Sequence, residues 1–315
     1  MAFEDFPINA LEFDARFRSE SACWEYLRSV RYPAGFVCLR CAGSRSYFVI
    51  DRGLDECATC GKQQSLTAGT MFHRTRSPLK TWFRAIFEFV SSKSGCSAKH
   101  IERTVGISYE TAWTWLHKIR DVMTRRDREQ LKDMVEADET YVGAPAPGYP
   151  GRKCGPNQFV VFGAVEVVGK GCGRTRLSPT PSASGEALIE EIKTSIQGGS
   201  TVATDGFGGY EELHKSHKHL PMVLGSPKNA SRFQPRIHKV FSLFKRLLLG
   251  TYHGSCRRKW AALYCAEFTF RFNRRNSTHR TQLFHRVMQQ TVKRTPRIHL
   301  LAGKKRLDHV VPVAA

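Results

Sequence analysis

The chain has 315 residues, 41% hydrophobic and 24% charged, a composition that is typical of a folded globular protein and excludes a disordered or fibrous chain. It has no run of about 18 apolar residues, which excludes an ordinary membrane-spanning helix, and it lacks a basic and apolar leader, so we expect a cytoplasmic protein. The net charge is +21, and residues 206–315 hold 22 lysines and arginines against four acidic residues. This surplus favours a polyanionic partner, above all nucleic acid, over a soluble protein that is merely basic.

Residues 1–70 contain four cysteines in two C-x2-C pairs that are separated by 15 residues, Cys38 with Cys41 and Cys57 with Cys60. Each pair can form a tight turn that directs two thiolates to one point, and a short hairpin between the pairs can bring all four together. Four thiolates complete the tetrahedral shell of a structural Zn²⁺ ion. A redox-active dithiol is the alternative, but neither pair lies in a thioredoxin-like βαβ pattern. We therefore expect a zinc ribbon with a leading helix.

Residues 71–130 are predicted to be helical. After a first amphipathic helix, Ser97 begins a short helix that ends near Val105, Gly106 forms a turn, and a longer helix spans residues 108–123. A short helix, a glycine turn and a capped second helix have the layout of a DNA-reading helix-turn-helix, although an ordinary helical hairpin is the alternative. In the first case the residues that face the DNA groove include Tyr109, Thr111 and Thr114.

The pattern then changes to strands, and residues 131–295 are expected to form a second domain. Adjacent strands, a crossover helix and further strands predict an α/β fold with a mixed sheet and flanking helices. The expected strands are residues 133–143, 158–168, 173–180, 200–205 and 220–225, with a helix at 184–197. Basic helices follow, and residues 296–315 form a basic tail.

Two aspartates in this domain are candidates for chemistry. Asp138 lies among apolar strand residues, and Asp205 ends another short strand. A carboxylate on a buried strand is unfavourable unless it is paired or binds a cation. Two of them on neighbouring strands would make an oxygen site that suits Mg²⁺ or Mn²⁺, and two such ions can promote phosphodiester cleavage. Glu139 would point to the other face of its strand. The alternative for either aspartate is an ordinary cap or turn residue.

Long blocks of the sequence resemble one known family. In the first half they are "RYPAGFVCLRC", "CATCGKQQSLTAGTMFHRTRSPLKTWFRAI" and "GISYETAWTWLHKIR"; in the second half they are "EADETYVG", "TDGFGGY", "FSLFKRLLLGTYHG" and "YCAEFTFRFNRR". The chain is similar over nearly its whole length to bacterial insertion-sequence transposases, which carry an N-terminal zinc ribbon before a DDE-type (ISXO2-like) catalytic domain of RNase H-like fold. One departure is Leu39, where such ribbons usually have proline.

The resemblance implies a role for four residues of the second domain. Asp138 and Asp205 would be the first two metal-binding carboxylates, and Lys245 matches a basic residue of the family. The third metal-binding position, usually glutamate or asparagine, falls on His238. A neutral imidazole can bind a divalent ion, and it suits Mn²⁺ better than Mg²⁺. The alternatives are an inactivating substitution at His238 and a replacement acid at Glu267.

Basic helices near the C-terminus complete the expected DNA-binding surface. Arginine side chains suit phosphate groups because the guanidinium fork donates two parallel hydrogen bonds. The aromatic residues between them recur every four positions, and we expect that stripe to be core rather than a base-stacking surface. The candidate phosphate-binding residues are Arg257, Arg258, Lys259, Arg274 and Arg275.

The resemblance implies a nucleoid-associated DNA transposase that binds the terminal inverted repeats of an insertion sequence, cleaves the strands with divalent metal ions and transfers them to a target. Two ends must be processed together, so we expect a homodimer or a higher assembly on double-stranded DNA. Two alternatives remain. One is a catalytically degenerate DNA-binding protein derived from a transposase. The other is a nuclease of the same fold that cleaves branched DNA.

Overall fold

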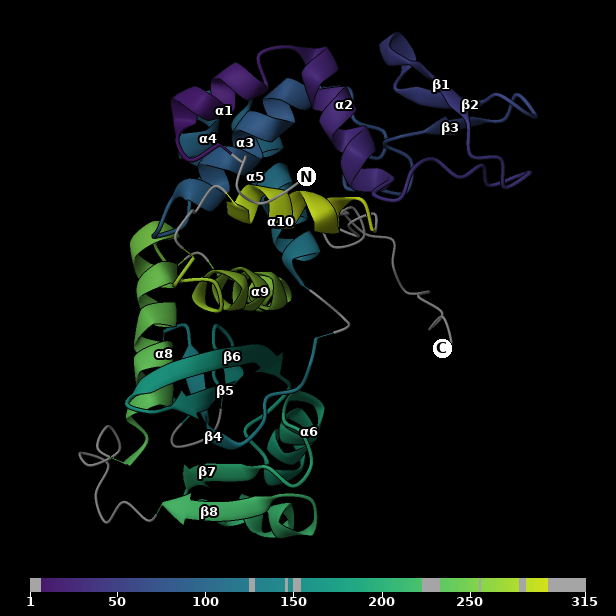
Figure 1. The fold of residues 1–315 in the computed structure, drawn as a ribbon. Coiled ribbons are helices and arrows are strands. Elements are labelled where there is room, and N and C mark those ends of the chain that lie inside the picture. The colour runs from purple at the N-terminus through teal and green to yellow at the C-terminus, as the bar shows by residue number, and fades with distance from the viewer. Residues whose placement is uncertain are drawn as a thin grey trace. The chain divides into compact units, whose positions relative to one another are not determined.

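The computed structural model describes residues 7–124, 128–144, 147–149, 154–222, 233–254, 256–277 and 282–293, and Figure 1 shows their fold. The chain divides into two compact units, unit 1 with residues 1–123 and 277–315, and unit 2 with residues 124–276. The expected basic tail, residues 296–315, lies outside the described residues. In the described part of the chain, no helix is long and apolar enough to cross a membrane.

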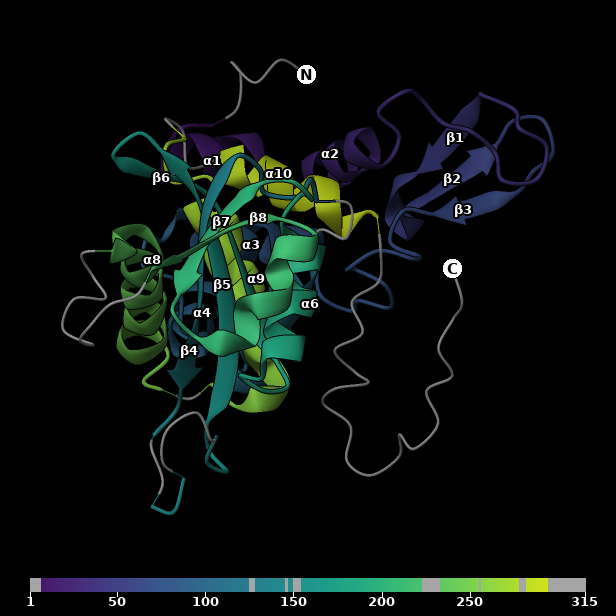
Figure 2. The same cartoon turned by 90° about the horizontal axis from the view of Figure 1, so that it is seen from below.

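Unit 1 begins with two helices and a three-stranded antiparallel sheet, visible in Figure 2. The elements are α1 (Ala10–Arg16), α2 (Glu20–Arg31), β1 (Ser46–Val49), β2 (Leu54–Cys57) and β3 (Gln63–Ser65). The expected hairpin between the two cysteine pairs is formed by β1 and β2. An ion pair joins the sheet to α2, because Arg28 Nε donates to Asp55 Oδ1 over 2.8 Å. The Asp55 side chain is fully buried, and the Arg28 side chain is half-buried.

The rest of unit 1 is helical, with α3 (Leu79–Ser91), α4 (Ala98–Val105), α5 (Tyr109–Met123) and α10 (Gln282–Thr291). The turn between α4 and α5 is formed by Gly106 with φ of +74°, a conformation that favours glycine. Trp82 of α3 stacks on Trp115 of α5 with ring centroids 3.6 Å apart. Phe284 of α10 lies edge-on to Phe83 at 5.4 Å. The sequence predicts a catalytic domain that runs to residue 295, whereas this aromatic cluster groups α10 with unit 1.

Unit 2 contains a five-stranded mixed sheet in the order β6-β5-β4-β7-β8. Within this sheet β4 pairs antiparallel with β5, and β5 pairs antiparallel with β6, whereas β7 and β8 run parallel to β4. This order and these directions are those of an RNase H-like sheet, as the resemblance predicts. The strands are β4 (Met134–Val142), β5 (Phe159–Val168), β6 (Gly171–Thr180), β7 (Thr201–Asp205) and β8 (Lys218–Met222). Two begin earlier than predicted, β6 at residue 171 and β8 at residue 218.

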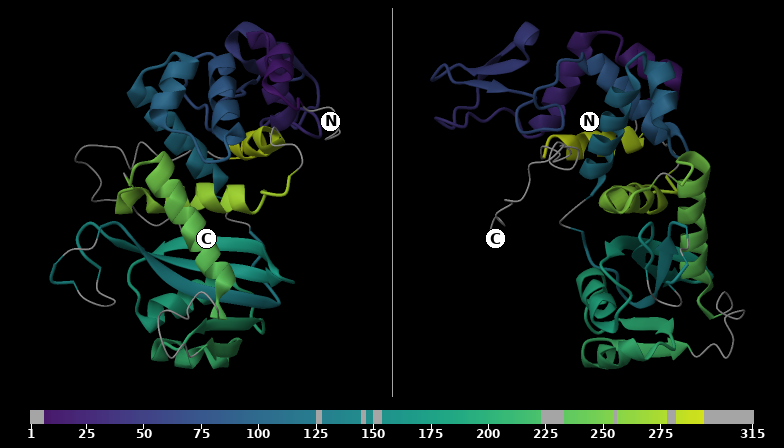
Figure 3. Two further views of the ribbon diagram at one scale, coloured as in Figure 1. Left: turned by 90° about the vertical axis from the view of Figure 1, so that its left-hand side faces the viewer. Right: turned by 180° about the vertical axis from the view of Figure 1, so that it is seen from behind.

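Helices cover both faces of this sheet (Figure 2). On one face, α6 (Gly185–Ser195) and the 3-10 helix η3 (Gly208–Lys215) close an apolar core with residues of β4, β5 and β7. On the other face, α8 (Pro235–Arg246) crosses the strands diagonally (Figure 3), and α9 (Ala261–Phe272) packs on β6 and beside α8. The crossing needs a glycine, because a Cβ at Gly163 of β5 would lie 2.4 Å from the ring of Phe241.

Candidate active site and metal centres

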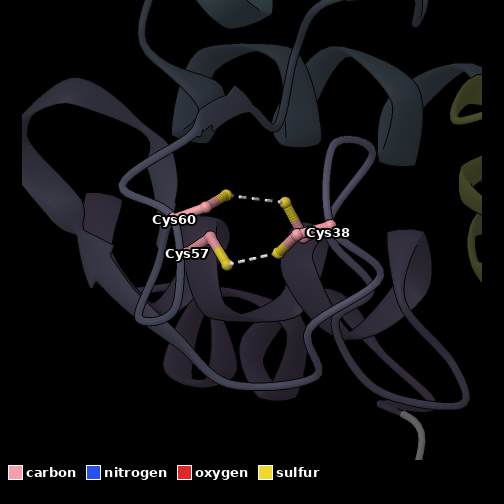
Figure 4. Close-up of side chains that lie close together, drawn as sticks. Cys38, Cys57 and Cys60 are labelled. Atoms are coloured by element: carbon pink, nitrogen blue, oxygen red, sulfur yellow. Dashed lines mark hydrogen bonds between the residues drawn. The ribbon is translucent and has the colours of Figure 1, made fainter.

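The four ribbon cysteines converge on one point. Figure 4 draws their side chains and labels Cys38, Cys57 and Cys60. The Sγ atoms of Cys38 and Cys60 lie 3.6 Å apart, as do those of Cys41 and Cys57. All four sulfur atoms lie within 4.8 Å of one another. With Zn–S bonds of about 2.3 Å, the sulfurs of a tetrahedral site are about 3.8 Å apart. The spacing of the four thiols therefore fits a Zn²⁺ ion.

Both cysteine pairs are built by the same backbone turn. Ala42 N–H donates to Cys38 O over 3.0 Å, and Gly61 N–H donates to Cys57 O over 2.9 Å. The two donor residues have φ of +57° and +67°. The amide N–H groups of Cys60 and Thr59 then point at the Cys57 sulfur and lower the pKa of that thiol to about 6. The turn after Cys57 thus favours the thiolate form of this residue, the form that binds a metal.

Asp138 and Asp205 lie on neighbouring parallel strands. The ladder between β4 and β7 pairs Glu136 with Ala203, and the same register continued by two residues places Asp138 opposite Asp205. Neighbouring strands lie about 4.8 Å apart, and residues two apart share a face. The cross-strand partner of Asp138 on β5 is Gly163, which α8 covers. The two carboxylates therefore belong to the face of the sheet under α8.

Glu139 lies on the opposite face, as the alternation of side chains requires. There it accepts a hydrogen bond of 3.3 Å from the hydroxyl of Tyr210, a buried residue of the core under α6. This contact gives Glu139 a structural role on the α6 side of the sheet. The acids of β4 on the α8 side are therefore Glu136 and Asp138.

Glu136 holds the N-terminus of α8 against β4, and the sequence analysis did not single it out. The residue is 2% exposed. Its Oε2 accepts from the backbone N–H of Arg236 over 2.8 Å and of Ile237 over 2.9 Å, and its Oε1 accepts from the Arg236 guanidinium over 2.9 Å. A carboxylate is favourable at a helix N-terminus because the unpaired N–H groups and the helix dipole both attract it.

His238 and Lys245 lie on α8 near the acids of β4. The pKa of His238 is lowered by burial, which outweighs the opposing effect of Glu136, so the imidazole is neutral at neutral pH. Its Nε2 atom is buried and has no hydrogen-bond partner within the described residues. The pKa of Lys245 is also lowered by burial, against the attraction of the Asp138 carboxylate. Lys245 therefore lies within the electrostatic field of Asp138.

The ligand atoms of Asp138, Asp205 and His238 lie farther apart than the four cysteine sulfurs. Of the residues described, only the four cysteines form a set of three or more histidine, cysteine or acidic ligands with all ligand atoms within 4.8 Å. Asp138, Asp205 and His238 thus lie on one face in neighbouring elements, but their ligand atoms do not converge to that distance.

Two family models match the chain. One describes an ISXO2-like transposase domain and matches residues 130–273, and the other describes a transposase zinc-ribbon domain and matches residues 18–63. Together they cover more than half of the chain in the order that the sequence blocks predict. The chain belongs to the ISXO2-like insertion-sequence transposases.

One curated relative and one solved structure are similar to this transposase. It is 25% identical over 216 residues to an uncharacterized protein in transposable element ISH50 of Halobacterium salinarum, a match that covers 62% of the chain and 71% of the relative. A chain in the crystal structure of a pre-cleavage Mos1 transpososome is 11% identical, with 68% of this chain and 79% of that chain covered. The TM-score of this match is 0.20.

The second helix of the transposase's predicted helix-turn-helix exposes its first turn. Tyr109 is 50% exposed, while Thr111 and Thr114 are half-buried. Ser108 caps the helix, because its Oγ accepts from Thr111 N–H over 3.3 Å and donates to Thr111 Oγ1 over 2.9 Å. The side of the helix away from these residues packs inward and is buried, namely Ala112, Trp115, Leu116 and Ile119. The packing agrees with the expected helix orientation, and DNA contact by the exposed turn stays a prediction.

The candidate phosphate-binding residues of unit 2 differ in their exposure and in their contacts within the unit. Arg257, Arg258 and Lys259 are exposed just before α9. Arg274 and Arg275 instead lie over the rings of Phe270 and Phe272, at 4.1 and 4.2 Å from the ring centroids. Both also donate to backbone carbonyls, and Arg275 reaches those of Cys172 and Gly173 at the start of β6.

The aromatic residues that recur every four positions along α9 belong to the core, as expected, and Glu267 of the same helix is also buried. The four aromatic residues of the stripe are all less than 9% exposed, namely Trp260, Tyr264, Phe268 and Phe272. Glu267 is fully buried and accepts from the Tyr252 hydroxyl over 2.8 and 2.9 Å and from Arg271 Nε over 2.9 Å. These contacts give Glu267 and Tyr252 a role in joining the exit of α8 to α9, and nothing in them favours Glu267 as a replacement metal ligand.

Proposed function

We propose that the chain is a DNA transposase whose second unit cuts phosphodiester bonds at the ends of an insertion sequence. Each freed 3′-hydroxyl then attacks a phosphodiester of the target DNA and displaces the 3′-oxygen of the target strand. The main support is the register of β4 and β7, which, continued two residues beyond its last pair, would bring Asp138 opposite Asp205 on the face that α8 covers. The family membership supports the reaction class. The residue roles rest on this register and on the position of α8.

The donor atoms of the residues on this face are of the kinds that bind a divalent ion. Two carboxylates supply oxygen ligands, and His238 offers a buried Nε2 without a partner in the described part of the chain. This mixed oxygen and nitrogen set suits Mn²⁺ better than Mg²⁺. A bound ion supplies Lewis acidity and an activated water for phosphodiester cleavage. Asp138, in the middle of β4, and Asp205, the last residue of β7, would hold such an ion.

The basic residues of the chain are proposed to bind and orient the DNA. Lys245 lies in the field of Asp138, so a phosphate oxygen brought to this face would meet an ammonium group beside the carboxylates. The exposed turn of α5 and the zinc ribbon would bind the terminal inverted repeats, and Arg257, Arg258 and Lys259 would neutralise backbone phosphates. We propose a homodimer or a higher assembly on DNA, since two ends react together. The site of action would be the bacterial nucleoid in the cytoplasm.

The test is an end-cleavage assay. The purified protein is incubated with linear DNA that carries the inverted repeats flanking its own gene, with Mn²⁺ or Mg²⁺, and nicks are mapped on sequencing gels. The proposal predicts cleavage at the repeat boundary and, with target plasmid added, strand-transfer products. Specific binding without any cleavage would identify a degenerate DNA-binding protein. Cleavage of four-way junctions without preference for the repeats would identify a junction nuclease.

Replacing His238 by glutamate should shift the metal preference of cleavage. A third carboxylate adds negative charge and an oxygen ligand, so we expect about ten-fold more cleavage in Mg²⁺ and little change in Mn²⁺. The assay is end cleavage over a range of Mg²⁺ and Mn²⁺ concentrations. His214→Glu, at an exposed residue of η3, adds the same charge elsewhere in unit 2 and should leave the preference unchanged. An unaltered ratio of Mg²⁺ to Mn²⁺ activity in His238→Glu would remove His238 from the metal site.

A further inference from the structure

The ladder between β4 and β7 ends just before the two aspartates. The paired residues are Met134 with Thr201, Val135 with Val202 and Glu136 with Ala203. Asp138 and Asp205 therefore lie two residues beyond the last pair. The separation of their backbones is not set by strand-to-strand pairing at that point, so another group must set it.

The side chain of Gln234 bridges the two strands where the ladder ends. Its Nε2 donates to the carbonyl of Ala137 on β4 over 3.2 Å and to the carbonyl of Ala203 on β7 over 3.0 Å. Gln234 is 1% exposed. Buried backbone carbonyls need hydrogen-bond partners, and the two N–H groups of one amide supply a partner to each strand. Each of the two carbonyls belongs to a residue within two positions of an aspartate.

Gln234 also joins these strands to α8. It immediately precedes the helix, and its own carbonyl accepts the backbone N–H of His238 over 3.3 Å. The next two backbone N–H groups, of Arg236 and Ile237, are held by Glu136 of β4. One buried residue thus contacts β4, β7 and the turn of α8 that carries His238.

We propose that Gln234 is a positioning residue that fixes the distance between β4 and β7 at the level of Asp138 and Asp205 and places His238 above them. This inference rests on the proposed function. The chemistry requires a primary amide, because only a neutral side chain with two N–H donors can serve both carbonyls. Glutamate would direct oxygens at them, and leucine, which is similar in size, would remove the Gln234 donor from both carbonyls.

The test measures metal affinity without DNA. Mn²⁺ is titrated into the full-length zinc-loaded protein by calorimetry, and we expect Gln234→Leu to weaken binding about ten-fold, as is typical when residues that orient metal ligands are removed. Gln130→Leu is the matched control, because the Gln130 amide also donates to two carbonyls, of Lys193 and Thr194, at 2.8 and 3.3 Å. It should bind Mn²⁺ like the wild type.

If Gln234→Leu does not fold, the same titration is made with Gln234→Asn. The asparagine amide is one methylene too short to reach both strands, so this variant should also bind Mn²⁺ more weakly.

The outcomes separate this inference from the proposed function. If the Gln234 variant that folds binds Mn²⁺ within two-fold of the wild type while Asp138→Asn and Asp205→Asn lose binding, Gln234 does not position the site and the proposed function stands. If neither aspartate variant changes Mn²⁺ binding, the metal site itself is wrong and the inference fails with it. Weaker binding in the Gln234 variant, with an unchanged Gln130 control, supports the positioning role.

Discussion

Asp138→Asn and Asp205→Asn should each reduce end cleavage at least about 1,000-fold, because each removes a charged ligand from metal ions that contribute several kcal/mol to the transition state. Asparagine keeps the size of the side chain, so the strands should remain paired. Rates of cleavage under single-turnover conditions measure the effect, and mobility shift on the terminal repeats measures binding, which should change less than two-fold.

Asp133→Asn is the matched control for both variants. Asp133 is exposed just before β4 and has φ of +64°, a conformation that asparagine tolerates. Its cleavage rate should equal that of the wild type. Full activity in either Asp138→Asn or Asp205→Asn would show that the two carboxylates do not act in the reaction.

Replacing Cys57 by serine should unfold the zinc ribbon and abolish recognition of the terminal repeats. Structural zinc supplies about 10–16 kcal/mol to small domains of this kind, which is more than a three-stranded sheet of eleven residues can replace. We expect the variant to lose its zinc, as measured by mass spectrometry, and to bind repeat DNA no better than random DNA.

The matched control for the ribbon is Cys172→Ser, which alters a half-buried cysteine of unit 2 outside the ribbon. It should keep one zinc ion per chain and the preference for the repeats. Retention of zinc by Cys57→Ser, or repeat-specific binding by a protein stripped of zinc, would contradict the role that we assign to the four cysteines.

The features that the sequence predicts well are local ones. The spacing of the four cysteines predicts the ribbon because each turn is closed within a few residues. Ser97 and Gly106 define α4 because a helix cap depends on the adjacent N–H groups and a glycine turn on its own backbone angles. The alternation of apolar residues places the strands of unit 2 to within about two residues, and it assigns Asp138 and Glu139 to opposite faces.

The features that the sequence does not reveal depend on partners far along the chain. Glu136 looks like any acid on a strand, and its role is set by the N-terminus of a helix 100 residues later. Gln234 is an unremarkable residue before a proline until β4 and β7 both place a carbonyl beside it. The assignment of α10 to unit 1 likewise depends on where Phe284 finds an aromatic partner. Such long-range pairings carry no periodicity or spacing that a single sequence exposes.

The central claim is that Asp138 and Asp205 share divalent metal ions beneath α8. The most direct measurement is anomalous scattering from crystals of the transposase grown with Mn²⁺. We predict an anomalous peak in contact with carboxylate oxygens of both aspartates. Carboxyl groups more than about 8 Å apart, with no manganese peak between them, would contradict the account, since that separation is too wide for the paired ions of this chemistry.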